Sequence, residues 1–274
     1  MQKSVTDLLK CPVCGSGMTT SEDGRSCFCF GERRHCYDLA RSGYLNLNPP
    51  KGGAGDLRDA IRARTCFLEA GYYQPLAEKI EELLQRIPSS KVVDAGCGEG
   101  YYTNYFAKNR TVIGVDLSKN GIDSGAKSSV AKATNAAFVV ASLFALPIQD
   151  QSVDVVVNIF APCAEAEFCR VLKTDGHVLV VAAGERHLLG LKEQIYDNPY
   201  CNSGRADLPK DMICVERTKL SYPVTVRGQE HIQALFSMTP YYWRTSLADR
   251  AKLERLEDLT TELDFDLFLF KKGI

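Results

Sequence analysis

The sequence lacks the features that mark membrane and exported proteins. No stretch approaches the run of about 18 apolar residues that a transmembrane helix needs. Residues 1–10 contain no apolar core of a signal peptide, so we expect a cytoplasmic protein without membrane contact. Internal repeats and low-complexity tracts are also missing. With 45% hydrophobic and 24% charged residues, the composition is that of a globular protein and argues against wholesale disorder.

An excess of positive charge is missing as well. The formal net charge of -1 excludes a uniformly basic nucleic-acid coat protein. The sum hides an asymmetry, because residues 1–64 carry ten Lys and Arg against seven Asp and Glu. The remainder of the chain is correspondingly acidic. The N-terminal quarter is therefore the better candidate for contact with phosphate groups.

Cysteine is plentiful but unevenly distributed. Five of the 11 cysteines lie between Cys11 and Cys36. In a chain without a leader, such clustering indicates metal ligands in a reducing compartment rather than disulfides. We therefore expect a small cysteine-rich module over residues 1–40. Residues 41–56, rich in Gly and Pro, predict a linker or flexible loop before a larger domain over residues 57–274.

Strands and helices alternate from residue 91 onward. Short apolar or β-branched runs predict strands at residues 92–95, 111–115, 137–141, 153–159 and 177–183. Repeated β-α units of this kind predict an α/β fold with a mostly parallel sheet covered on both faces. Residues 57–87 predict a helical stretch broken near Gly71. Two later runs, at 220–226 and 263–270, predict a half-exposed pair of strands at the sheet edge.

Soft ligands between residues 11 and 35 predict a zinc site. Cys11 and Cys14 form a CxxC pair, and Cys27, Cys29 and His35 follow. Two knuckles joined by a hairpin can enclose tetrahedral zinc, and so short a module needs a metal to fold. Loop length favours the set Cys11, Cys14, Cys29 and His35. Cys27 is the alternative to Cys29, because residues two apart in a strand point to the same side. A redox role for the CxxC pair is less favoured, because no thioredoxin-like βαβ unit surrounds it.

A glycine-rich turn follows the strand predicted at residues 92–95. It reads Asp94-Ala95-Gly96-Cys97-Gly98-Glu99-Gly100, and its glycines let a ligand approach the backbone closely. Asp116 ends the next strand, where an acidic residue can accept both hydroxyls of an adenosine ribose. The glycines run GxGxG, so the GxGxxG fingerprint of NAD binding is incomplete. The pattern DxGCGxG resembles motif I of class I S-adenosylmethionine-dependent methyltransferases.

Two further loops are expected at the same edge of the sheet. In proteins with this motif the segment after the third strand lies beside the adenine, which places the backbone of Ser142 and Leu143 there. The carboxyl end of the fourth strand normally faces the substrate. Asn158, Phe160 and Ala161 are therefore the catalytic candidates, although no side chain stands out as a general base.

Several stretches taken together resemble one family. They are the CPxC module, Gly71-Tyr72-Tyr73-Gln74-Pro75-Leu76, Asp94 to Thr103, Ala161-Pro162-Cys163, Arg186-His187-Leu188 and Met238-Thr239-Pro240. The whole chain is similar to the 23S ribosomal RNA guanine-N1 methyltransferases that act on hairpin 35. This resemblance implies a Rossmann-like class I methyltransferase fold with a seven-stranded, mostly parallel sheet and a small N-terminal zinc-binding domain. It also implies S-adenosyl-L-methionine and Zn²⁺ as cofactors, 23S rRNA as partner, and a homodimer.

The resemblance also assigns site residues. Tyr73 would close over the cofactor, Gly98 and Glu99 would contact its methionine part, and His187 would lie near it. The candidate cofactor-binding residues are thus Tyr73, Asp94, Gly96, Gly98, Glu99, Gly100, Asp116, Ser142, Leu143 and His187. The family usually has three residues between the third Cys and the His, but five separate Cys29 from His35 here, so Cys27 stays open as an alternative.

RNA contact is best assigned to the zinc module. Arg25, Arg33, Arg34 and Arg41 lie on or beside it, and a solvated charged face is the alternative explanation for them. Two other functions fit parts of the pattern. A small-molecule methyltransferase would share the glycine loop but generally lacks a zinc module. A non-catalytic zinc-ribbon RNA-binding protein would not need an intact loop with Asp116.

Overall fold

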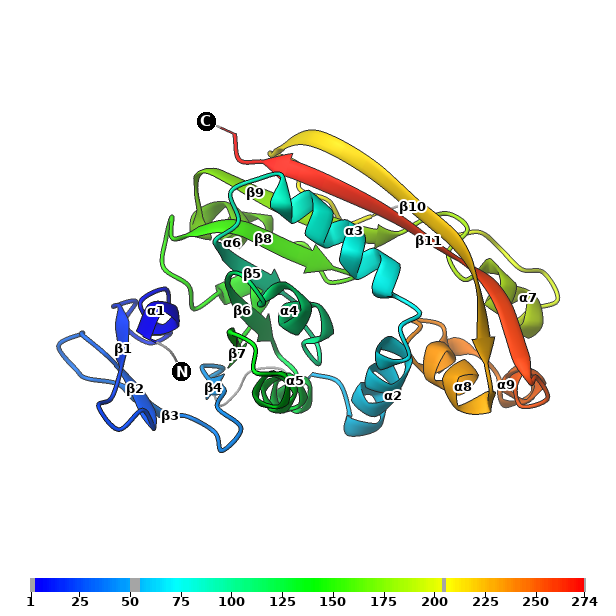
Figure 1. Cartoon of the computed structure of the whole chain (residues 1–274), viewed down its shortest axis with the longest axis horizontal. Coiled ribbons are helices and arrows are strands. Elements are labelled where there is room, and N and C mark those ends of the chain that lie inside the picture. The colour runs from blue at the N-terminus through cyan, green and yellow to red at the C-terminus, as the bar shows by residue number, and fades with distance from the viewer. Residues whose placement is uncertain (1–2, 50–54, 204–205, 274) are drawn as a thin grey trace.

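The computed structural model describes residues 3–49, 55–203 and 206–273 and contains two sheets (Figure 1). The small antiparallel sheet lies near the N-terminus and consists of β1 (Met18–Thr20), β2 (Ser26–Cys29) and β3 (Cys36–Asp38). The large sheet has the order β10-β11-β9-β8-β5-β6-β7-β4. Its strands are β4 (Leu45–Asn46), β5 (Lys91–Ala95), β6 (Thr111–Asp116), β7 (Ala136–Val140), β8 (Val153–Ile159), β9 (Leu172–Ala183), β10 (Ile213–Arg227) and β11 (Asp258–Lys271).

The large sheet confirms the predicted α/β class and its mostly parallel topology. Strands β5 to β9 pair in parallel, whereas β11 runs antiparallel to β9 and β10 antiparallel to β11. These are the seven expected strands, and β4 adds a short parallel strand beside β7. Leu45–Asn46 lies within the segment expected to be a linker, so that part of the segment joins the sheet. Residues 50–54 of the same segment lie outside the described residues.

Helices cover both faces of the large sheet. The described helices are α1 (Lys3–Thr6), α2 (Arg58–Glu69), α3 (Gln74–Gln85), α4 (Tyr101–Phe106), α5 (Lys119–Lys132), α6 (Glu165–Val171), α7 (Leu189–Ile195), α8 (Gln229–Ser237) and α9 (Leu247–Leu253), with 3₁₀ turns η1 (Leu143–Ala145) and η2 (Tyr242–Arg244). Alternate residues of β8 face opposite cores. Val155 belongs to the core that residues of α3 and α4 share, whereas Val156 belongs to the core that includes α6. None of the described helices is long and apolar enough to cross a membrane.

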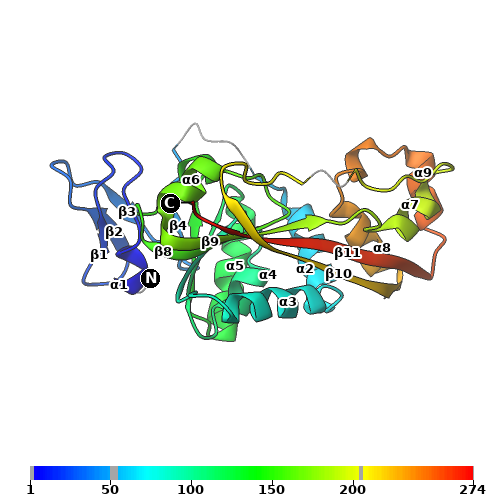
Figure 2. The same ribbon diagram turned by 90° about the horizontal axis from the view of Figure 1, so that it is seen from above.

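The strand pair at the sheet edge differs from the prediction. β10 pairs with β11 along almost its full length, well beyond the expected 220–226. β10 exposes alternate residues as predicted, but β11 is buried on both faces, with Asp264 and Phe265 fully enclosed. The reason is that β11 lies between β10 and β9, while α7 and α8 pack against its first half. In Figures 1 and 2, helices α7 to α9 and the N-terminal sheet lie at opposite ends of the molecule.

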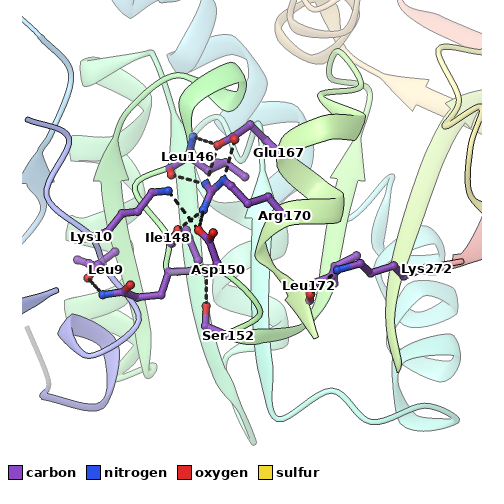
Figure 3. Close-up of polar contacts among 11 residues, drawn as sticks. Leu9, Lys10, Leu146, Ile148, Asp150, Ser152, Glu167, Arg170, Leu172 and Lys272 are labelled. Atoms are coloured by element: carbon purple, nitrogen blue, oxygen red, sulfur yellow. Dashed lines mark hydrogen bonds and ion pairs between the residues drawn. The ribbon is translucent and has the colours of Figure 1, made fainter. Parts of the chain in front are cut away.

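The N-terminal module is joined to the large domain by backbone hydrogen bonds. Lys10 N–H donates to Pro147 O at 3.0 Å, and Gln149 N–H donates to Leu8 O at 2.8 Å. The guanidinium of Arg170 holds the loop that contains Pro147 and Gln149, because it donates to the carbonyl oxygens of Leu146 and Ile148 (Figure 3). The segment just before Cys11 is therefore fixed against the loop that leads from β7 to β8.

Candidate functional site

Four predicted metal ligands meet at the edge of the small sheet. The Sγ atoms of Cys11, Cys14 and Cys29 and a ring nitrogen of His35 all lie within 4.8 Å of one another. The Cys14 and Cys29 sulfurs are 3.6 Å apart, and His35 Nδ1 lies 3.6 Å from Cys11 Sγ and 3.5 Å from Cys29 Sγ. Cys27 lies outside this group, and its Sγ contacts Thr20 Oγ1 at 3.9 Å instead.

This donor set fits zinc. A tetrahedron with Zn–S bonds of about 2.3 Å has S···S edges of about 3.8 Å and S···N edges of about 3.6 Å. The three ligand distances of 3.5 to 3.6 Å are close to those edges, and small shifts bring the others within reach of one ion. Hydrogen bonds from Ser16, chiefly from its backbone N–H, lower the pKa of the Cys14 thiol to about 6, which favours the thiolate that binds metal. The Tyr37 hydroxyl lies 3.2 Å from Cys11 Sγ and can donate to that sulfur.

The outer face of the same small sheet carries aromatic rings and arginines. Phe30 is 69% exposed, and its ring meets that of Phe28 edge-on at 6.5 Å. The Arg34 guanidinium lies 3.5 Å above the Phe28 ring. Arg33 is also exposed, and neither arginine forms an ion pair with any residue that the structure describes. We call Phe28, Phe30, Arg33 and Arg34 the ribbon face.

The glycine-rich turn joins β5 to α4 and lies against the loop after β8. Gly96 has φ +86°, and a Cβ there would lie 2.4 Å from Cβ of Ala161. Only glycine therefore allows these two loops to touch. Under the turn, Thr103 Oγ1 donates to Asp94 Oδ2 at 2.5 Å, and burial raises the pKa of Asp94 to about 7.

Asp116 already makes two hydrogen bonds at the end of β6. Its Oδ2 accepts from Gly98 N–H at 3.0 Å and its Oδ1 accepts from Ser118 N–H at 2.7 Å. A carboxylate oxygen has a second lone pair, so each can still accept from a hydroxyl. Ser142 caps η1, where its hydroxyl accepts from Phe144 N–H, and the buried Leu143 follows it.

Arg64 of α2 is a basic residue at this site that no sequence motif marks. Its Nη1 lies 3.4 Å from Glu99 Oε2 and its Nη2 lies 2.8 Å from Asp56 Oδ2. The same Nη1 would lie 3.2 Å from a Cβ on Gly98, so the guanidinium rests against the glycine turn. Burial raises the pKa of Glu99 to about 7, although Arg64 opposes that shift.

The loop after β8 brings the catalytic candidates to the same edge. Asn158 is fully buried, and its Nδ2 donates to Ala95 O at 3.1 Å and to Pro162 O at 3.2 Å. Phe160 has a left-handed backbone with φ 53°, and its side chain is 48% exposed. Such a conformation is unusual for a bulky residue and is typical of functional loops.

Tyr73 and His187 lie next to Phe160. The His187 ring stacks near that of Phe160 at 6.2 Å, and its Nε2 lies 3.2 Å from the Tyr73 hydroxyl. Burial lowers the pKa of His187 to about 4, so the ring is neutral at neutral pH. Asp264 N–H donates to Nδ1 at 3.3 Å, which places the ring hydrogen on Nε2 and directs it toward Tyr73.

Comparisons with known proteins agree with this geometry. A family model described as "RlmA, N-terminal" matches residues 9–51, and one described as "Methyltransferase domain" matches residues 92–176. The Bacillus subtilis protein YxjB, provisionally named a 23S rRNA (guanine-N(1)-)-methyltransferase, is 31% identical over 97% of both chains. The chain belongs to the 23S rRNA guanine-N1-methyltransferase family. Members are enzymes that use S-adenosyl-L-methionine, and the N-terminal module is their zinc ribbon.

One further relative agrees with this family, and one solved structure agrees with the fold. A Streptomyces fradiae 23S rRNA (guanine(748)-N(1))-methyltransferase is 30% identical over 71% of this chain and 70% of its own length. The solved structure of the Bacillus subtilis YcgJ protein covers 72% of this chain and 98% of its own, with a TM-score of 0.50 and 15% identity. At that identity the likeness concerns the fold alone.

Proposed function

We propose that this enzyme transfers a methyl group from S-adenosyl-L-methionine to N1 of a guanine in hairpin 35 of 23S rRNA. The observation that carries the proposal is the joining of a complete zinc-ligand set to an intact glycine turn with Asp116 in one chain. A small-molecule methyltransferase of the same fold has no need of the ribbon. A non-catalytic RNA-binding protein has no need of the turn.

The cofactor site that we propose surrounds the turn between β5 and α4. It consists of Tyr73, Asp94, Gly96, Gly98, Glu99, Gly100, Asp116, Ser142, Leu143 and His187. The free lone pairs of Asp116 suit ribose hydroxyls, and the backbone of Ser142 and Leu143 suits the adenine. When bound, the cofactor supplies an electrophilic methyl carbon. The turn and β8 loop then position the acceptor, and positioning supplies most of the rate enhancement.

For the guanine, we propose a place beside Phe160 and the backbone of Ala161. A base in an RNA hairpin must leave its stack to be methylated, and a partly exposed ring at the end of β8 can receive it. Asn158, also a catalytic candidate from the sequence, takes a positioning role instead. Both of its amide hydrogens are used by backbone carbonyls, so we assign it to positioning the loop that carries Phe160.

Residues 1–40 act, in this proposal, as a zinc-binding RNA-recognition module, and residues 57–274 as the methyltransferase domain. Cys11, Cys14, Cys29 and His35 hold the zinc. The arginines of the ribbon face, with Arg25 and Arg41, bind RNA phosphates. We also propose a homodimer and a cytoplasmic location, because the resemblance and the rRNA substrate imply them.

The decisive experiment combines the protein with labelled S-adenosylmethionine and unmodified 23S rRNA, followed by mapping of reverse-transcription stops. We expect a stop at one guanine of hairpin 35, and its position identifies the target. An Asp116→Ala variant is the matched control and should produce no stop. If the wild-type protein binds the cofactor but leaves the hairpin unmodified, the RNA substrate is wrong and the small-molecule alternative gains support.

A further inference from the structure

Helix α2 holds the Arg64 side chain against the glycine turn. Helix α2 begins next to the β6–α5 loop, where Asp56 O accepts hydrogen bonds from Ser118 Oγ and Asn120 Nδ2, both at 3.3 Å. The helix then runs along the turn, so that Arg64 reaches Gly98 and Glu99. The Arg64 side chain is 27% exposed. Its guanidinium is therefore anchored beside Gly98 and still partly exposed.

The charges around the turn are unbalanced. Asp94, Glu99, Asp116 and Asp56 all lie at or beside the turn, and Arg64 is the cation that contacts it among the residues the structure describes. S-adenosylmethionine carries two positive groups, the sulfonium and the α-ammonium, and one negative group, the α-carboxylate. The acidic side chains suit the two cations. The carboxylate needs a donor, and an arginine fork matches a carboxylate in shape and charge.

We propose that Arg64 binds the α-carboxylate of the methionine part of the cofactor. The inference rests on the proposed cofactor site, and it adds a residue and a specificity to that site. Two contacts, to Glu99 and Asp56, use only part of the five N–H donors of the guanidinium. The remaining donors are available to a ligand lying on Gly98. Asp56 and Glu99 hold the fork in place before the ligand arrives, which lowers the entropic cost of binding.

A purely structural role for Arg64 predicts a different effect of its loss on ligand binding. If Arg64 only neutralises Glu99, its loss disturbs the whole turn and weakens every adenosine ligand alike. If Arg64 binds the carboxylate, its loss weakens only ligands that contain the amino-acid part. S-adenosylhomocysteine has that part, whereas 5′-methylthioadenosine lacks it and keeps the adenosine and the sulfur.

The test is calorimetric titration of both ligands into the full-length zinc-loaded protein. We expect Arg64→Ala to weaken the binding of S-adenosylhomocysteine by about 10- to 100-fold, which is the range for a charge-assisted bidentate contact. The binding of methylthioadenosine should weaken by less than about 3-fold. Arg64→Lys keeps the charge without the fork and should fall between wild type and Arg64→Ala. Arg62→Ala, on the exposed side of the same helix, should change neither affinity.

Equal losses for both ligands, or no loss for either, would overturn the inference while leaving the cofactor site in place. Failure of the wild-type protein to bind either ligand, or full binding by an Asp116→Ala variant, would overturn the proposed cofactor site and the inference with it. If Arg64→Ala does not fold, the ratio of the two affinities in Arg64→Lys carries the same information.

Discussion

The side-chain amide of Asn158 donates a hydrogen bond to the backbone carbonyl of Ala95, 3.1 Å away. Ala95 ends β5 immediately before the glycine turn, and Asn158 lies near the end of β8. A second hydrogen bond from the same amide reaches Pro162 O. One buried side chain thus joins the turn that we assign to the cofactor with the loop that carries Phe160.

Loss of this amide should destabilise the protein and slow the reaction. Asn158→Ala leaves the buried Ala95 carbonyl and the partly buried Pro162 carbonyl without this donor, which costs roughly 1 to 3 kcal/mol of unfolding free energy. Asn158→Asp should cost more, because a carboxylate replaces the donor beside two carbonyl oxygens. Denaturant unfolding measures both variants, and exposed Asn109→Ala is the control. An Asn158→Asp protein as stable as wild type would contradict the assignment.

Zinc content should depend on Cys29 and not on Cys27. Cys29→Ser removes one of four ligands and should reduce bound zinc to background, whereas Cys27→Ser should retain it because that sulfur lies outside the cluster. Cys36→Ser, next to His35 but exposed, is a second control. Elemental analysis of the purified proteins measures the metal. Retention of zinc by Cys29→Ser together with its loss from Cys27→Ser would reverse the ligand assignment.

The unfolding free energy of the ligand-free protein should depend on pH through the titration of Asp94. Burial raises the pKa of Asp94 to about 7, whereas an unfolded Asp titrates near 3.9. Between these values the folded state keeps a proton that the unfolded state has released. The contribution of Asp94 is therefore most favourable below about pH 4 and declines as pH rises to about 7, by up to about 4 kcal/mol.

Asp94→Asn should remove this decline. Urea unfolding between pH 4 and 7.5 compares the slopes of the variant and the wild type, so that the other titrating groups cancel. Asp175→Asn, an exposed change, should leave the slope unaltered. If the wild type and Asp94→Asn show parallel pH profiles, Asp94 titrates at its ordinary value in the folded state.

Arg170 should control how firmly the zinc ribbon is docked. Its Nη1 donates to Ile148 O at 2.8 Å and its Nη2 to Leu146 O at 2.9 Å, in the loop that pairs with Leu8–Lys10 (Figure 3). Arg170→Ala leaves both carbonyls unpaired and should lower unfolding free energy by roughly 1 to 3 kcal/mol. Hydrogen exchange at Lys10 N–H, which donates to Pro147 O, should accelerate. Arg170→Lys cannot donate to both carbonyls, so its unfolding free energy and its exchange rate at Lys10 should lie between those of wild type and Arg170→Ala. An unchanged exchange rate in Arg170→Ala would show that Arg170 does not hold the ribbon in place.

Most of the large domain could be predicted from local sequence, because its central strands are short apolar runs followed by helices. The edge pair could not. The first half of β10 is mostly exposed and carries no apolar alternation, so its length depends on pairing with β11. The burial of β11 depends on α7 and α8, which come from elsewhere in the chain.

The same distinction applies to the site. The glycine turn and Asp116 are contiguous signals, since each follows a predicted strand. Loop length favours Cys29 over Cys27 but leaves Cys27 open, and the hairpin geometry decides between them. Arg64 gives no signal at all, because a lone arginine on an amphipathic helix is ordinary and its partner Glu99 lies 35 positions away.

The ribbon face should bind RNA through Phe30 as well as through its arginines. An exposed ring can stack on an unpaired base, an interaction that costs about 1 to 3 kcal/mol when removed. Phe30→Ala should therefore weaken a hairpin RNA by about 5- to 100-fold and leave the salt dependence of binding unchanged. Arg33→Ala should weaken binding less and flatten that dependence, because it removes a phosphate contact. Fluorescence anisotropy over a salt series measures both, with exposed Val130→Ala as control. Phe30→Ala affinities equal to wild type, with zinc retained, would show that the ring does not contact RNA.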